Sequence, residues 1–120
     1  MQPAPVSLMF VPKDALVSFA PIDPDGLILA ALDGELDLDC ADKVRDSLAE
    51  AAVQPDCRFL VVDVSRLDFI DSYALGALVS ARNTASAAGV TLTLANPSPP
   101  VRKAIEVTGL GEVFGLPAHG

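Results

Sequence analysis

Ser72 stands between a strand-like and a helix-like segment, a position at which a protein can accommodate a phosphate group. Residues 59–64 before it are almost entirely apolar, and residues 73–88 after it have helical spacing. The first N–H groups of a helix have no acceptor within the helix and lie at the positive end of its dipole, so the fold tolerates a phosphate there. A plain N-cap, formed by Ser72 or by Asp71, gives the same pattern, and these residues alone leave both interpretations open.

The chain offers little for catalysis or metal binding. A serine hydrolase needs a base and an oxyanion site, but the Gly-x-Ser-x-Gly motif is absent and the single histidine, His119, is next to the last residue. Cys40 and Cys57 lie far apart and share with His119 no spacing typical of metal ligands. We therefore expect no enzyme activity, no catalytic residue, no metal and no cofactor, and we expect both cysteines to be reduced, part-buried thiols.

Asp63 suggests a second phosphorylation chemistry. The segment Phe59-Leu60-Val61-Val62-Asp63 resembles the strand and acceptor aspartate of a receiver domain, in which that aspartate is phosphorylated. Receivers also have an acidic pair after the first strand and a lysine after the fifth. Here Asp23 and Asp25 come only after Pro21, and no lysine follows the last candidate strand. A receiver-like phosphoacceptor that uses Asp63 is therefore the weaker alternative.

Apolar runs predict the strands that would position Ser72. The run 59–64 is the most strand-like, so we expect a central strand covered by helices, and its carboxyl end leads to Ser72. Residues 33–37 predict a turn that leads towards a helix. Further strands are expected at 15–22, on an edge of the sheet, and at 27–32, 90–95 and 112–116.

Three helices are predicted among these strands. The second is 73–88, which Gly89 stops, and the third is 101–108, which follows Ser98 and two prolines and ends at Gly109. The first begins with Asp39 as its N-cap and ends before Pro55, with one face formed by Ala41, Val44, Leu48, and Ala51 or Ala52. The order of elements predicts the α/β class.

Composition limits the class of partner. A chain of 120 residues with 51% hydrophobic residues fits one domain with a true core. Eight Lys and Arg stand against sixteen Asp and Glu, a formal charge of -8 that argues against nucleic acid and anionic membranes as partners. Nothing at the start resembles a signal peptide, and no apolar run approaches the ~18 residues of a membrane span. We therefore expect a cytoplasmic protein.

Several separate motifs, taken together and in order, resemble those of one known family. Residues 27–116 are similar to the STAS domain of bacterial anti-sigma factor antagonists. The resemblance is carried by Gly34-Glu35-Leu36-Asp37, by Asp63-Val-Ser-Arg-Leu-Asp-Phe-Ile-Asp-Ser72 with Leu75-Gly76, and by Ser98-Pro-Pro-Val-Arg-Lys-Ala-Ile-Glu-Val-Thr-Gly-Leu110. It implies a single STAS domain, which we place at residues 14–117. Residues 1–13 before it are expected to be a loose leader.

The resemblance implies a mixed β-sheet with helices packed mainly on one face. It also implies a regulator of transcription that binds a kinase-type anti-sigma factor when unphosphorylated and releases the sigma factor held by that kinase. The kinase then phosphorylates Ser72 with ATP, and a metal-dependent serine/threonine phosphatase reverses the change. A STAS scaffold subunit of a larger stress-signalling complex, switched at the same serine, is the alternative. The expected oligomeric state is a monomer or weak dimer.

Carried over residue by residue, the resemblance gives a set of site residues and two departures. The family usually has Ser or Thr where this chain has Tyr73, and Gly where it has Ala74. Both departures lie next to the phosphorylation site, where Tyr73 adds bulk and Ala74 takes up room that glycine leaves for a docking backbone. The implied partner-binding residues are Gly34, Glu35, Asp37, Asp71, Ser72, Tyr73, Ala74 and Leu75.

Overall fold

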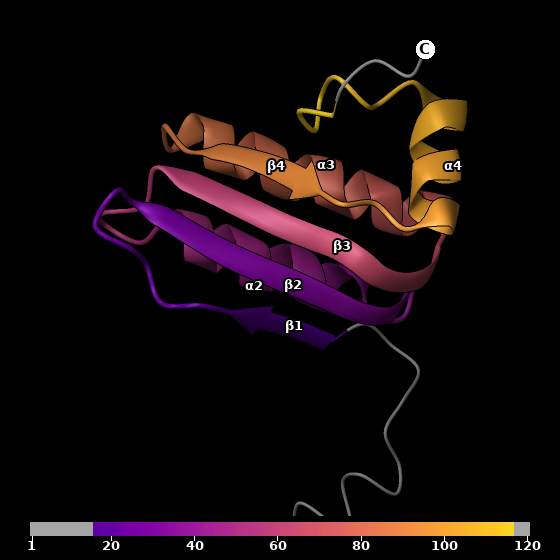
Figure 1. Cartoon of the computed structure of the whole chain (residues 1–120), viewed down its shortest axis with the longest axis horizontal. Coiled ribbons are helices and arrows are strands. Elements are labelled where there is room, and N and C mark those ends of the chain that lie inside the picture. The colour runs from indigo at the N-terminus through magenta and orange to yellow at the C-terminus, as the bar shows by residue number, and fades with distance from the viewer. Residues whose placement is uncertain (1–15, 117–120) are drawn as a thin grey trace, which may run out of the picture.

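Four strands form a mixed sheet within residues 16–116, the part of the chain that the computed structural model describes (Figure 1). Their order is β1 (Leu16–Phe19), β2 (Leu27–Leu36), β3 (Phe59–Ile70) and β4 (Thr91–Ala95), so β1 and β4 are the edges. The first pair is antiparallel, and the β2–β3 and β3–β4 pairs are parallel. The predicted leader, residues 1–13, lies outside the described residues.

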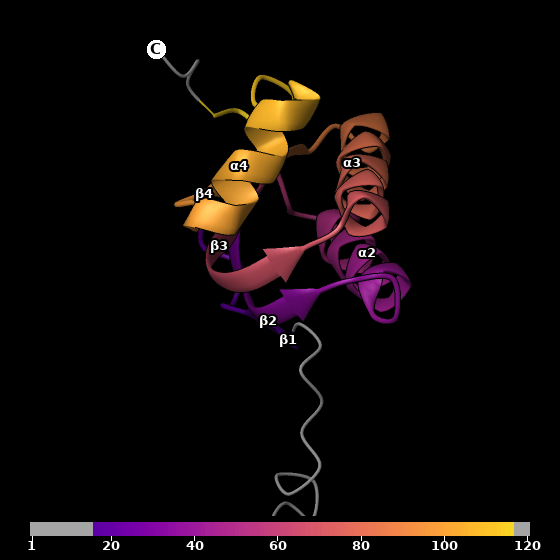
Figure 2. The ribbon, with the colours of Figure 1, turned by 90° about the vertical axis from the view of Figure 1, so that its right-hand side faces the viewer.

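Two of the helices cover the same face of this sheet. Helices α2 (Ala41–Ala52) and α3 (Ser72–Ala87) lie side by side behind the strands, whereas α4 (Pro99–Thr108) crosses one end of the sheet (Figures 1 and 2). Alternate residues of the two central strands point towards these helices, because side chains along a strand project to opposite faces. The buried set is Ile28, Ala30, Leu32, Leu60, Val62 and Val64. The predicted α/β class and the predicted mixed sheet with helices mainly on one face are confirmed.

Helix positions predicted from local patterns agree with the structure. Helix α2 buries Ala41, Val44, Leu48, Ala51 and Ala52, the face that its spacing predicts. Helix α4 follows Ser98, as predicted, and ends at Gly109 in the left-handed conformation with φ 71°. The Ser98 hydroxyl does not cap this helix but donates a buried hydrogen bond to the Leu67 carbonyl of β3. Ser98 therefore also ties α4 to the sheet.

Both central strands are longer than their apolar runs. The predicted turn at residues 33–37 is wrong over residues 33–36, because β2 continues there and pairs with a continuation of β3, with Gly34 opposite Leu67 and Leu36 opposite Ile70. Two irregularities in the register accompany this extension. Residues 33–36 therefore form a strand because they pair with β3, although their glycine and acidic residues locally favour a turn.

Two further predictions are wrong. Cys40, not Asp39, is the N-cap of α2, and the Cys40 side chain makes no capping hydrogen bond. Instead, the Asp37 carboxylate accepts the Asp39 N–H at 3.0 Å and closes a short turn before the helix. Residues 112–116 form turns rather than a final strand, although the Phe114 carbonyl accepts the Leu94 N–H of β4 at 3.0 Å. Phe114 is fully buried, which explains the strand-like apolar pattern.

Two general features of the described residues bear on function. Cys40 and Cys57 are free, as predicted, and both are buried. Among residues 16–116, no helix is long and apolar enough to cross a membrane.

Candidate phosphorylation and partner-binding site

Asp71 joins the end of β3, the start of α3 and the loop after β2. One carboxylate oxygen accepts the Ala74 N–H at 2.8 Å, so Asp71 is the N-cap of α3. The other accepts the Leu38 N–H at 2.9 Å, and the Asp71 N–H donates to the Leu36 carbonyl at 3.1 Å. Of the two N-cap candidates that the sequence left open, the structure therefore selects Asp71.

Ser72 is the first residue of α3 and is exposed to solvent. The predicted accessible serine at a helix start is confirmed. Asp71 supplies the cap, and Ser72 makes no side-chain hydrogen bond to another residue in the described part of the chain. A phosphate added there would lie beside the first N–H groups of α3, where the helix dipole favours negative charge.

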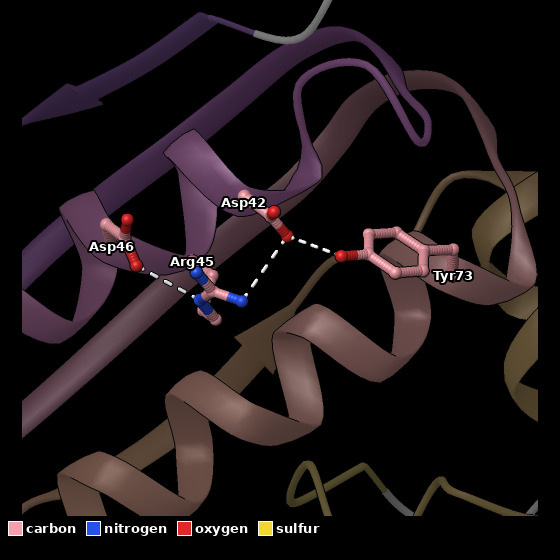
Figure 3. Close-up of polar contacts among 4 residues, drawn as sticks. All are labelled: Asp42, Arg45, Asp46 and Tyr73. Atoms are coloured by element: carbon pink, nitrogen blue, oxygen red, sulfur yellow. Dashed lines mark hydrogen bonds and ion pairs between the residues drawn. The ribbon is translucent and has the colours of Figure 1, made fainter.

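Tyr73 links the first turn of α3 to the first turn of α2 (Figure 3). Its hydroxyl donates a 2.7 Å hydrogen bond to Asp42, and the Arg45 guanidinium contacts the same carboxylate oxygen at 3.3 Å. Arg45 also donates to Asp46 at 3.0 Å. The hydrogen bond to Asp42, together with the negative charge of that carboxylate, raises the pKa of Tyr73, which stays neutral near pH 7. Tyr73 is 47% exposed, so it presents an aromatic residue at the surface directly after Ser72 in the chain.

The remaining predicted site residues divide into surface and interior positions. Ala74 and Leu75 are buried, so their side chains belong to the core that α3 helps to form. Gly34 and Glu35 lie half-buried near the end of β2, and Asp37 follows in the loop that Asp71 contacts. The structure thus brings the two predicted motifs together at the carboxyl ends of β2 and β3.

Leu38 and Phe69 are exposed apolar residues beside this junction that the sequence reasoning missed. The Leu38 N–H bonds to Asp71, and Phe69 lies two residues before Asp71, opposite Glu35 of β2. Their signal in the sequence is a large apolar residue directly after an acidic one, in Asp37-Leu38 and Asp68-Phe69. We define the junction surface as Leu38, Phe69, Ser72 and Tyr73.

Asp63 is not arranged as a receiver acceptor. Its carboxylate accepts hydrogen bonds from the Ser65 hydroxyl at 2.6 Å, the Asn96 amide at 2.8 Å and the Ser65 N–H at 2.9 Å, which hold its pKa below the usual range. Asp23 instead closes the loop before β2, where its carboxylate accepts the N–H groups of Asp25 and Leu27. The Asp23 carboxylate lies beside the Leu27 N–H, whereas Asp63 pairs with Ala31, which is four residues, or about 13 Å, further along β2. The acceptor and the acidic pair therefore do not meet.

The geometry defines a class of protein: a small α/β domain with its polar site on the surface, at the ends of parallel strands and the start of a helix. The chain belongs to the STAS domain family, whose model matches residues 21–119. The predicted family is therefore confirmed.

Named relatives and solved structures agree with this assignment. An anti-sigma F factor antagonist of Paenibacillus polymyxa is 28% identical over 91 residues, which cover 76% of this chain and 78% of the relative. The solved structure of the anti-sigma factor antagonist SpoIIAA in its unphosphorylated form matches with a TM-score of 0.66 and 30% identity, over 81% of this chain and 84% of SpoIIAA. The phosphorylated form of the Bacillus protein SpoIIAA matches with a TM-score of 0.60 and 28% identity, over 81% and 86% of the two chains.

Proposed function

We propose that this protein is an anti-sigma factor antagonist, a partner-switching regulator controlled by phosphorylation of Ser72. The observation that carries the proposal is the exposed Ser72 at the start of α3, capped by Asp71. Relatives named as anti-sigma factor antagonists, and similarity to SpoIIAA in both its unphosphorylated and its phosphorylated forms, support it. The protein acts by binding and not as an enzyme.

The junction surface supplies the partner contacts of the unphosphorylated protein. Its apolar members, Leu38, Phe69 and Tyr73, offer area that gains free energy when a partner covers it. The partner is a kinase-type anti-sigma factor, which transfers a phosphoryl group from ATP to the Ser72 hydroxyl. A metal-dependent serine/threonine phosphatase returns the protein to its binding form. The protein works in the cytoplasm, as a monomer or weak dimer.

Phosphorylation would switch binding off through charge. A phosphoserine carries about -1.5 to -2 charges at neutral pH. At Ser72 this charge would face the partner's nucleotide phosphates and would add to the carboxylate of Asp71 beside it. The start of α3 favours an anion, so the fold is retained while the docked state is destabilised.

A scaffold subunit of a larger stress-signalling complex is the second candidate. It uses the same STAS fold and the same Ser72, but its partners would be further scaffold subunits rather than a sigma-factor regulator. Unaltered binding to every candidate kinase after substitution of Ser72 or Tyr73 would favour this candidate.

The test is a pull-down from the protein's own cells followed by phosphosite mapping. We expect a kinase-type anti-sigma factor in the bound fraction and, with that kinase and ATP, an acid-stable phosphate on Ser72. Ser72→Ala should abolish the phosphate and keep the complex, whereas Ser80→Ala, an exposed serine two turns along α3, should change neither. Labile modification of Asp63 by acetyl phosphate, with Ser72 untouched, would instead favour a receiver-like protein.

Tyr73 gives a second prediction at this site. Tyr73 follows the acceptor serine directly in the chain, and its hydrogen bond to Asp42 fixes the position of its ring. The ring adds bulk next to the residue that the kinase must approach. We expect Tyr73→Ser to speed phosphorylation of Ser72, measured as the initial rate with the native kinase. Tyr73→Phe keeps the ring and serves as the matched control. If Tyr73→Ser abolishes phosphorylation by the native kinase, then Tyr73 is a matched contact of a specialised pair.

A further inference from the structure

The face of the sheet opposite α2 and α3 carries a continuous apolar surface. Leu27 pairs with Phe59 and Leu29 pairs with Val61 across the central strands, and all four side chains point away from the two helices. Leu29 is 48% and Phe59 47% exposed. We call these four residues the open face. It belongs to the side of the sheet that is turned towards the viewer in Figure 1, with α2 and α3 behind the strands.

We expect another segment or molecule to pack on this apolar surface. Parallel strands usually have both faces covered, and contiguous exposed apolar surface on a monomer marks an interaction site. The turn after α4 covers only the β4 side, where Gly115 lies against Thr93, the neighbour of Val61. Within the described residues, neither α2 nor α3 reaches the remaining part, because both pack on the other face.

We propose that the segment Val6-Ser7-Leu8-Met9-Phe10-Val11 of this same chain binds the open face. The described chain begins at Leu16, which pairs with Asp33 and lies on this side of the sheet. Further along β1 a shallow depression of about 460 Å³ is lined by Ser18, Leu29 and Ala31 and also by the polar residues Asp63, Ser65 and Arg66. The binding segment therefore joins the domain at the edge of the surface that it covers.

Length and turn chemistry fit this arrangement. Six extended residues span about 20 Å, which equals the span of β2 from Leu27 to Asp33. The four residues 12–15, which include Pro12 and Asp14, are of the types that reverse a chain. Residues 6–11 can thus run back over the whole length of the open face.

Charge favours this segment over a second copy of the protein. Residues 1–13 contain Lys13 and no Asp or Glu, whereas all sixteen acidic residues lie after them. A second copy would bring a net charge of -8 against an equal charge, which opposes association. The neutral apolar segment covers the open face without that repulsion.

A fluorescence measurement tests the proposal, because the full chain contains no Trp. Phe59→Trp places a single reporter on the open face, and Leu29→Trp is a second reporter should the first not fold. We expect Leu8→Ser with Phe10→Ser to shift the emission of this reporter to the red and to raise its quenching by acrylamide several-fold. Gln2→Ser with Ala4→Ser is the matched control and should change neither. A reporter at Val107, which is 77% exposed on α4, should not respond to either pair.

Two results would overturn the proposal. Equal quenching of the reporter with and without Leu8 and Phe10 would show that the segment does not lie on the open face. If acrylamide quenching of the Trp reporter falls as protein concentration rises, and light scattering gives the mass of a dimer, a second copy of the chain covers the open face instead.

Discussion

Ser72→Asp is expected to weaken binding of the anti-sigma factor by about tenfold or more, because like charges brought together at an interface cost on the order of one to several kcal/mol. The added carboxylate would stand at the start of α3, next to Asp71, on the junction surface where we propose that the partner docks. Ser72→Ala should keep the affinity of the unmodified protein and lose the switch. Isothermal titration with the purified anti-sigma factor, before and after incubation with ATP, measures both.

Measuring the stability of Ser72→Asp and Ser72→Ala shows whether weaker binding comes from a changed contact with the partner or from an unfolded protein. A carboxylate near a helix N-terminus is worth about 0.3–1 kcal/mol, in the stabilising direction, so Ser72→Asp should unfold in urea at the same or a slightly higher concentration. Equal affinities of Ser72→Asp and the unmodified protein for the kinase would contradict a switch based on charge at this residue.

Asp71→Ala should lower the free energy of unfolding by about 1–3 kcal/mol, the largest effect on stability that we expect at the site. The substitution removes the N-cap of α3 and leaves the Leu38 N–H without its acceptor. Without this hydrogen bond, the loop after β2 should loosen. Because Leu38 belongs to the junction surface, affinity for the partner should then fall as well. Urea unfolding followed by circular dichroism gives the stability, and titration gives the affinity.

Two variants control for the charge of Asp71. Asp68→Ala removes an exposed carboxylate from the same segment, one with no hydrogen bond to the described residues, and should leave stability unchanged. Asp71→Asn keeps a cap oxygen without the charge and should fall between the parent and Asp71→Ala. If Asp71→Ala and Asp68→Ala unfold alike, the two hydrogen bonds of the Asp71 carboxylate contribute no net stability.

Local patterns in the sequence predicted the helices, the core strands and the candidate acceptor. The spacing of Val44 and Leu48 is sufficient to identify the buried face of α2, and the helical spacing of residues 73–88 is sufficient to place Ser72 near a helix start. These features depend on side-chain periodicity and on caps within a few residues, which a single sequence contains. The motifs around Asp37 and Ser72 likewise predicted the STAS family, because the residues that carry the resemblance are contiguous in the chain.

The contacts that assemble the site come from tertiary structure. Asp71 bonds to Leu38 across 33 residues, and Tyr73 bonds to Asp42 across 31 residues, so no local pattern reports either contact. The strand at residues 33–36 forms because β3 offers its backbone groups there, against the turn preference of its own residues. Sequence by itself determined which residues can form a helix start with a free serine. Packing of α2 against α3, and of β2 against β3, decided which side chains surround that serine, because hydrogen bonds between distant segments form only once the core is closed.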